Sequence, residues 1–201
     1  MKLSDLFEEE TKSAYGDFSD RGLSTFIGTR INSKINATFK CNNNGLTSLE
    51  GGPKRVIGDF ECKNNKLTDL KGSPERVIGK IDASNNPELS SLEGVTPEID
   101  DNLVLYNCPR LTSLKGIHKH FKGGYLKGVI MLPNSINSHL LGLVLIPGLL
   151  HAGLANANKT RLADALKIIN NYLNRHIDEE ADVIQCQQEL IDAGLKAFAQ
   201  L

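Results

Sequence analysis

The 201-residue sequence predicts an α/β repeat fold, in which a short solenoid carries a parallel β-sheet on its concave face. Two observations predict this fold. A short pattern of apolar residues and asparagine recurs about five times through the middle of the chain, and helical periodicity replaces it near residue 138. We therefore expect an N-terminal cap over residues 1–35, repeats over residues 36–137, and an α-helical C-terminal cap or small domain over residues 138–201.

The clearest copy of the repeat reads Ile57-x-x-Phe60-x-Cys62-x-x-Asn65-x-Leu67. Apolar residues at positions 1, 4, 6 and 11 with asparagine at position 9 are typical of the leucine-rich repeat. The other copies read Phe39-x-Cys41-x-x-Asn44-x-Leu46, Ile78-x-x-Ile81-x-Ala83-x-x-Asn86-x-x-Leu89, Leu103-x-Leu105-x-x-Cys108-x-x-Leu111 and Leu126-x-x-Val129-x-Met131-x-x-Asn134-x-Ile136. Repeats this short leave no room for a long convex helix, so we expect extended or 3₁₀-like convex segments.

Alternation along each predicted strand separates an inner from an outer face. In Phe60-Glu61-Cys62 the apolar side chains point inward and the charged side chain points outward. Successive strands would lie about 4.8 Å apart in a parallel sheet. The asparagines of the repeat would then form an internal ladder whose amides satisfy backbone groups where the chain bends. The predicted members of this ladder are Asn44, Asn65, Asn86 and Asn134.

A solenoid leaves an open apolar face at each end, and that face must be covered. At the N-terminal end the acidic pattern of residues 4–10 predicts a short helix. Five apolar residues follow it and are expected to cover the first repeat: Phe18, Leu23, Phe26, Ile27 and Ile31.

The C-terminal third has a helical pattern. We expect one helix capped by Asn158 or Thr160, and a second helix from about Glu179 to Ala193 that ends at Gly194. Residues 140–150 would be buried between these helices and the last repeat. A cap that covers the last repeat and a second binding unit are both compatible with this pattern.

Composition excludes several classes of partner. The net charge of −1 indicates neither a nucleic acid nor a membrane as partner. The longest apolar run, residues 140–150, is too short to span a bilayer, and the N-terminus lacks the apolar core of a signal peptide. We therefore expect a cytoplasmic protein.

The cysteine spacing and the lack of catalytic motifs also argue against an enzymatic or metal-binding function. The four cysteines lack metal-finger spacing, so we expect them buried as small apolar residues, with a disulfide or metal site as the alternative. The sequence contains no phosphate-binding loop, no zinc-hydrolase motif and no nucleophile elbow. We predict no catalytic residue, no cofactor and no metal site. The close pair His118 and His120 is expected on a loop, without a third ligand.

Three segments resemble a family of leucine-rich-repeat proteins encoded by tailed bacteriophages. They are FECKNNKLTDLKGSPERV at residues 60–77, LLGLVLIPGL at residues 140–149 together with IINNYL at residues 168–173, and CQQELIDAGL at residues 186–195. The resemblance covers roughly residues 39–201 and implies a phage origin and a leucine-rich-repeat fold. Residues 1–35 show no resemblance.

The short repeat also looks like that of secreted bacterial effectors whose repeats precede a ubiquitin-ligase domain. Such a ligase needs a reactive cysteine in its own large helical domain. Cys186 lies among about 65 residues outside the repeats and lacks basic neighbours that would lower its pKa. We therefore reject ligase activity.

The outward positions of the predicted strands are the candidate partner-binding residues. They are Lys40, Asp59, Glu61, Lys63, Lys80, Asp82, Asn102, Val104, Tyr106, Ile130 and Leu132. Mixed charges on the first three strands give way to aliphatic residues and Tyr106 on the last two. An aromatic side chain with aliphatic neighbours and a polar rim is typical of a protein-interaction hot spot. The alternative is that the C-terminal segment folds back over these residues.

These observations favour a non-enzymatic, protein-binding module that holds a host or phage protein, for example to block a host defence factor. The alternative is a virion or assembly component that acts through self-association, as a homo-oligomer. An enzyme with chemistry in its C-terminal unit is a third possibility, but only scattered acidic residues and histidines there would support it.

Overall fold

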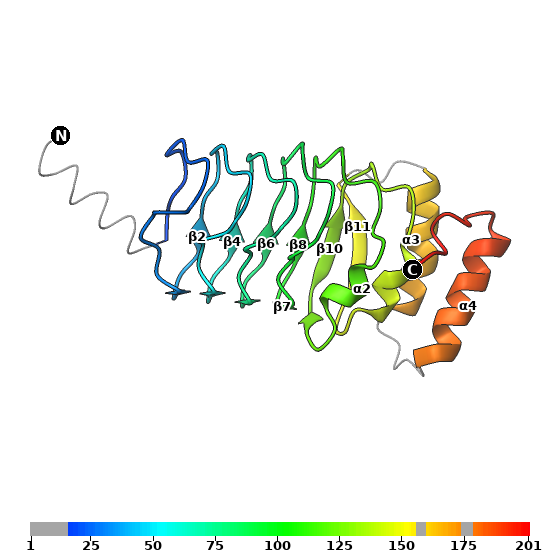
Figure 1. The fold of residues 1–201 in the computed structure, drawn as a ribbon. Helices are drawn as coiled ribbons and strands as arrows, with labels where there is room; N and C mark the ends of the chain where they lie inside the picture. Colours follow the sequence, from blue (N-terminus) through cyan, green and yellow to red (C-terminus); the bar gives the residue numbers. More distant parts are fainter. Residues whose placement is uncertain (1–15, 156–159, 174–178) are drawn as a thin grey trace, which may run out of the picture.

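The computed structural model describes residues 16–155, 160–173 and 179–201. The chain forms a parallel β-solenoid of about six turns, with helices at its C-terminal end (Figure 1). The sheet predicted from the repeat, here called sheet A, has six strands: β2 (Phe39–Lys40), β4 (Phe60–Glu61), β6 (Ile81–Asp82), β8 (Leu103–Val104), β10 (Val129–Leu132) and β11 (His151–Leu154).

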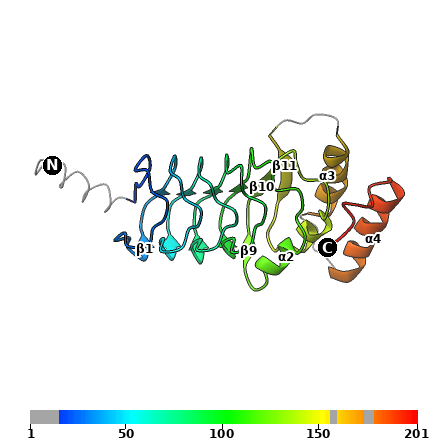
Figure 2. The same ribbon diagram turned by 45° about the horizontal axis from the view of Figure 1, so that its top comes forward.

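A second parallel sheet, which the sequence did not predict, lies along another side of the solenoid (Figure 2). This sheet B has five strands: β1 (Lys34–Ile35), β3 (Arg55–Val56), β5 (Arg76–Val77), β7 (Glu98–Ile99) and β9 (Tyr125–Leu126). Each turn therefore carries one strand of each sheet from β1 to β10, and the core lies between the sheets.

Two columns of apolar side chains build that core. Sheet B contributes a buried residue from each turn: Ile35, Val56, Val77, Ile99 and Leu126. Sheet A contributes the residue four positions later: Phe39, Phe60, Ile81, Leu103 and Ile130. The rings of Phe39 and Phe60 stack with centroids 5.5 Å apart, which shows how identical positions of successive turns pack on one another.

The observed register differs from the predicted repeat in the second, third and fifth copies. In the second and third copies the first inward position is Val56 and Val77, while Ile57 is half-buried and Ile78 is exposed. In the fifth copy the predicted inward residues Val129 and Met131 point outward. Because side chains alternate along a strand, an error of one residue exchanges the two faces.

The internal asparagine ladder is confirmed for three of its four predicted members, Asn44, Asn65 and Asn86. The amide of Asn65 donates to three backbone carbonyls, and its oxygen accepts from the N–H of Leu46 at 3.2 Å. Asn134 is exposed, and the prediction for it was wrong. Ser135 takes the slot, and its hydroxyl donates to the carbonyls of Cys108 at 3.1 Å and Leu111 at 2.7 Å.

The N-terminal residues that the structure describes continue the coil before the first repeat. Phe18 and Phe26 pack against Phe39, with ring centroids 5.4 Å and 5.9 Å away. Leu23 and Ile31 are partly buried against the same core, as predicted. Ile27 is 72% exposed, so its predicted covering role was wrong. The helix predicted over residues 4–10 lies outside the described residues.

Beyond the repeats, both predicted helices are present. They are α3 (Arg161–Tyr172), capped by the Thr160 hydroxyl, and α4 (Glu179–Asp192), followed by Gly194 at φ 73°. The alternative cap, Asn158, lies outside the described residues. The structure adds α2 (Ile117–His120) and the 3₁₀ helix η1 (Leu141–Leu145). His118 and His120 therefore lie on a short helix and not on a loop.

Strand β11 lies in the range predicted to be helical, and that prediction was wrong there. It pairs with β10 in parallel and adds a sixth strand to sheet A. The amide of Asn170, on α3, accepts from the N–H of Ala152 at 2.8 Å and donates to its carbonyl at 2.9 Å. One asparagine side chain thus occupies the hydrogen-bonding groups that a further strand would use.

Candidate functional site

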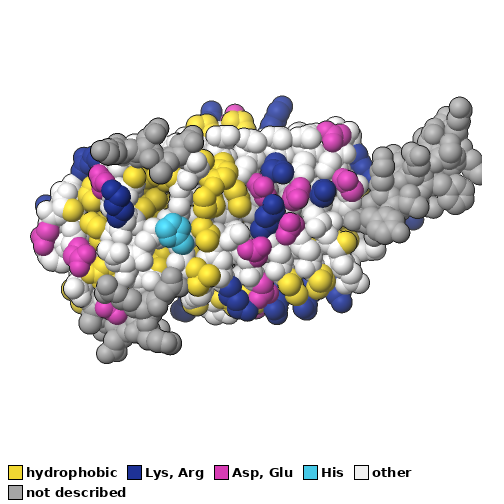
Figure 3. Space-filling model, turned by 180° about the vertical axis from the view of Figure 1, so that it is seen from behind, with side chains coloured by type: hydrophobic (Ala, Val, Ile, Leu, Met, Phe, Trp, Pro, Cys, Tyr) yellow, Lys and Arg dark blue, Asp and Glu magenta, His cyan; other side chains and the backbone are white. Residues whose placement is uncertain are grey.

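The outer face of sheet A carries the predicted partner-binding residues and is divided into two regions. Charged side chains gather over its N-terminal strands, and a band of hydrophobic side chains crosses the sheet beside them (Figure 3). The residues of each region follow from the register. Outward positions on β2, β4 and β6 are charged, whereas those on β8 and β10 are apolar.

The charged side chains largely pair with one another. Lys63 lies 3.7 Å from the Glu61 carboxylate and 3.8 Å from that of Asp82. Lys80 lies 4.0 Å from Asp59. Together with Lys40 these residues carry three positive and three negative charges, so the region has no net charge. Ion pairs of this kind contribute about 1 kcal/mol or less each, and the region offers little attraction for a partner of either sign.

Two of the predicted residues support the backbone of the next turn. The Asp59 carboxylate accepts from the N–H of Lys80 at 3.0 Å, and the Asn102 amide oxygen accepts from the N–H of Val129 at 2.7 Å. Their side chains therefore bind the solenoid itself, which the alternation pattern did not reveal.

The apolar band is present, but two of its predicted members were wrong. Val104 and Tyr106 point outward and are half-buried. Ile130 and Leu132 are fully buried in the core, because the fifth copy is shifted by one residue from the predicted register. Their outward neighbour Met131 takes the place beside Val104.

A column of glycines in the sequence indicates the correct register of the fifth copy. Gly58, Gly79 and Gly128 each lie two residues after the buried residue of sheet B and two residues before the inward residue of sheet A. A Cβ at Gly128 would come within 2.6 Å of backbone of the preceding turn, so the corner requires glycine. Aligning Gly128 with Gly58 and Gly79 places Ile130, not Val129, in the core.

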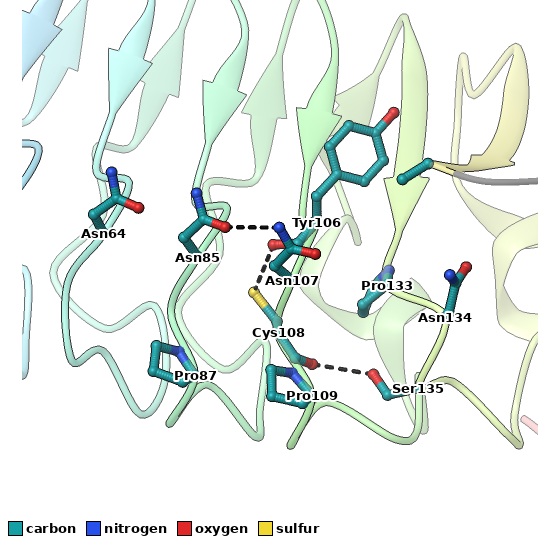
Figure 4. A pocket seen from close by; sticks show the side chains of 11 residues that line it. Asn64, Asn85, Pro87, Tyr106, Asn107, Cys108, Pro109, Pro133, Asn134 and Ser135 are labelled. Atoms are coloured by element: carbon teal, nitrogen blue, oxygen red, sulfur yellow. Dashed lines mark hydrogen bonds between the residues drawn. The ribbon is translucent and has the colours of Figure 1, made fainter.

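A groove of about 750 Å³ opens next to the apolar band, where sheet A strands end (Figure 4). Its lining residues come from five successive turns and carry no formal charge. They are Asn64, Asn85, Pro87, Tyr106, Asn107, Cys108, Pro109, Pro133, Asn134, Ser135 and Ala155. Of the predicted site residues, only Tyr106 belongs to this groove.

A second row of asparagines runs along the groove, one residue before the internal ladder. Asn43, Asn64, Asn85 and Asn107 all have φ between 53° and 58°. Asparagine tolerates this left-handed conformation better than other residues with a β-carbon. The amide of Asn64 donates to Asn43 at 2.7 Å, and that of Asn107 donates to Asn85 at 2.8 Å (Figure 4 shows the second pair). The recurring Asn-Asn dipeptides were the sequence signal for this outer row, and the prediction missed it.

A cluster of charged side chains lies beside sheet B, centred on Asp100. Asp100 lies 2.6 Å from the Lys127 ammonium, 3.1 Å from the Arg76 guanidinium and 3.3 Å from the Tyr125 hydroxyl. The hydrogen bond from Lys127, followed by that from Arg76, lowers the pKa of Asp100 below its ordinary value. Asp100 therefore joins the turn of Arg76 to the turn of Lys127, with its own turn between them.

All four cysteines are buried, as the interpretation of small apolar residues predicted, and Cys41, Cys62 and Cys108 are free thiols. Burial raises the pKa of the Cys108 thiol to about 11, and it also raises the pKa values of Cys41 and Cys62. Within residues 16–155, 160–173 and 179–201, no group of three or more histidine, cysteine or acidic side chains is placed to hold a metal ion. In the same ranges, no helix has the length and apolar character needed to cross a membrane.

Comparisons with known proteins identify no relative. No protein-family model, no curated protein and no solved structure matches the chain.

Proposed function

We propose that this protein is a non-enzymatic binding module of the leucine-rich-repeat type, which holds a partner protein on the outer face of sheet A. In this proposal the chain is phage-encoded, acts in the cytoplasm of the infected bacterium, and binds a host protein such as a defence factor. The apolar band formed by Val104, Tyr106 and Met131 is the observation that carries the proposal.

The apolar band is suited to a partner protein because most charged side chains beside it already form ion pairs with one another. The charged residues on one side pair with one another, so a partner does not have to strip water from unpaired charges there. A half-buried tyrosine beside aliphatic side chains supplies apolar area together with a hydroxyl that can hydrogen-bond. Such anchors with a polar rim account for most of the binding energy in protein interfaces.

The proposal includes the finer description of the fold. The packing of Phe18 and Phe26 on Phe39 supports an N-terminal cap over residues 1–35. The pairing of Asn170 with Ala152 supports α3 and α4 as a C-terminal cap that closes the solenoid. A cap, in contrast to a second binding unit, leaves sheet A as the principal surface for a partner.

A pull-down with tagged protein from bacterial lysate tests the proposal. We expect a stoichiometric protein partner on the wild-type bait and its loss with the double variant Tyr106→Ala, Met131→Asp. Ile78→Ala is the matched control, because Ile78 is an exposed apolar residue directly after strand β5 of sheet B, away from the apolar band. Far-UV circular dichroism of each variant verifies that it is folded.

Retention of the partner by the folded double variant would refute the assignment of the site. Light scattering on the purified protein gives the second readout. A defined homo-oligomer without a captured partner would replace the proposal by the alternative, a virion or assembly component.

A further inference from the structure

The groove beside the apolar band has a chemical character that restricts its ligand. None of its eleven lining residues is charged, and asparagine amides, proline rings and Tyr106 dominate its surface. A charged ligand would lose water without meeting an opposite charge there, so the complementary ligand is uncharged. The groove also extends over five turns, which corresponds to about 19 Å along the solenoid axis.

The side-chain hydrogen bonds of the outer asparagines repeat every two turns along the solenoid axis. The hydrogen bonds join Asn64 to Asn43 and Asn107 to Asn85, whereas no bond joins Asn64 to Asn85 among the described residues. In each pair the donor residue keeps its amide oxygen for other contacts, and the acceptor residue keeps its NH₂ group. The same combination of donor and acceptor therefore recurs every second turn, at about 9.6 Å.

A polyproline II helix has nearly the same period. It rises about 3.1 Å per residue with three residues per turn, so each face repeats after about 9.3 Å. An extended β-strand repeats each face after about 6.8 Å and would lose register with the asparagine pairs within one repeat. Polyproline II also leaves its backbone groups unpaired, so every third residue can present them to an asparagine pair.

On the basis of the proposed protein-binding function, we propose that the groove binds an uncharged, proline-rich segment of the partner in the polyproline II conformation, with Tyr106 as the aromatic contact. The segment lies along the solenoid axis across Asn64, Asn85 and Asn107. Its carbonyl groups accept from the NH₂ group of Asn85, and a non-proline N–H donates to the amide oxygen of Asn64 or Asn107. About six residues fill the roughly 19 Å of the groove.

Fluorescence anisotropy with a labelled (Ala-Pro-Pro)₄ peptide tests this inference. We expect saturable binding below about 1 mM, and no binding of a labelled (Ala-Gly-Ser)₄ peptide of the same length. Tyr106→Ala should weaken binding at least about tenfold. Asn85→Gly should weaken it about threefold to tenfold, since glycine keeps the left-handed backbone but removes the amide. Asn171→Ala is the control, because Asn171 is an exposed asparagine on α3 that does not line the groove, and it should bind like wild type.

Three outcomes would overturn the inference. They are equal binding of both peptides, unchanged binding by the Asn85 and Tyr106 variants, and absence of (Ala-Pro-Pro)₄ binding up to 1 mM. Displacement of the bound peptide by the neutral oligosaccharide maltohexaose would indicate a saccharide site instead. If the peptide fails but protein capture still depends on Tyr106, the inference fails while the proposed function stands. If both fail, the proposed function fails as well.

Discussion

Replacement of Asn65 by alanine tests whether the internal asparagine ladder holds successive turns together. The Asn65 side chain is 3% exposed and bonds only to backbone groups. Its NH₂ group donates to the carbonyls of Cys41, Cys62 and Lys63 at 3.0–3.1 Å. Its oxygen is the one acceptor that the Leu46 N–H meets among the described residues, at 3.2 Å.

The expected loss of stability follows from what each backbone group keeps after the substitution. The Leu46 N–H loses its described acceptor, and a buried donor without a partner costs about 1–3 kcal/mol. The carbonyls of Cys41 and Cys62 keep donors from the amides of Asn44 and Asn86. Their loss is therefore smaller, about 0.5 kcal/mol for each carbonyl. We expect Asn65→Ala to lower the free energy of unfolding by about 2–4 kcal/mol.

Equilibrium unfolding in urea, followed by far-UV circular dichroism, measures this change. Asn64→Gly is the matched control, because Asn64 precedes Asn65 in the chain, is exposed, and makes one side-chain hydrogen bond with Asn43. We expect this control to change the free energy of unfolding by less than about 1 kcal/mol. A loss below 1 kcal/mol for Asn65→Ala, with an unchanged slope of the transition, would refute the structural role assigned to the ladder.

Three further predictions address the register, the cysteines and the charge cluster. Ile130→Lys should destabilise the fold by more than about 3 kcal/mol and Met131→Lys by less than about 1 kcal/mol in urea unfolding, and the reverse order would restore the predicted register. The thiols, including Cys62 and Cys108, should react with a disulfide reagent at pH 8 only after urea is added, because burial raises their pKa values; rapid labelling of the native protein would contradict this. Asp100→Asn should lower the free energy of unfolding by about 0.5–1 kcal/mol at pH 7. This difference from wild type should vanish as the pH falls through the lowered pKa of Asp100, because a carboxyl group with a depressed pKa stabilises the fold only above that pH. A deficit that persists at pH 2 would assign the loss to packing.

The parts of the fold that could be predicted are those where burial dictates the residue. Phe60 and Cys62 alternate with Glu61, and the asparagine at the position of Asn65 recurs in the first three copies, because inward strand positions favour apolar side chains and an amide satisfies the backbone groups at the bend. Strand β11 could not be found in this way. Its sequence, His151 to Leu154, has little β propensity, and it pairs only because β10 and the Asn170 amide supply partners for its backbone.

The candidate site was predicted less well than the fold, for a related reason. Outward positions follow from alternation alone, so any error in register moves the whole set to the wrong face. This happened at Ile130 and Leu132, while Val104 and Tyr106 were placed correctly because the fourth copy was read in the right register. Sheet B escaped prediction because each of its strands carries a single buried residue, such as Val56 or Val77, so no alternation of apolar residues shows in the sequence.

The two asparagine rows show how one dipeptide serves both the fold and the surface. In Asn64-Asn65 the second residue spends its amide on four backbone groups inside the solenoid and keeps no capacity for a ligand. The first residue has a left-handed backbone that turns its amide outward, and its one side-chain bond leaves the oxygen for other contacts. Substitutions at the inner row should therefore change stability, and those at the outer row should change ligand affinity. Because adjacent residues of the same type are compared, differences in side-chain chemistry cannot account for that separation.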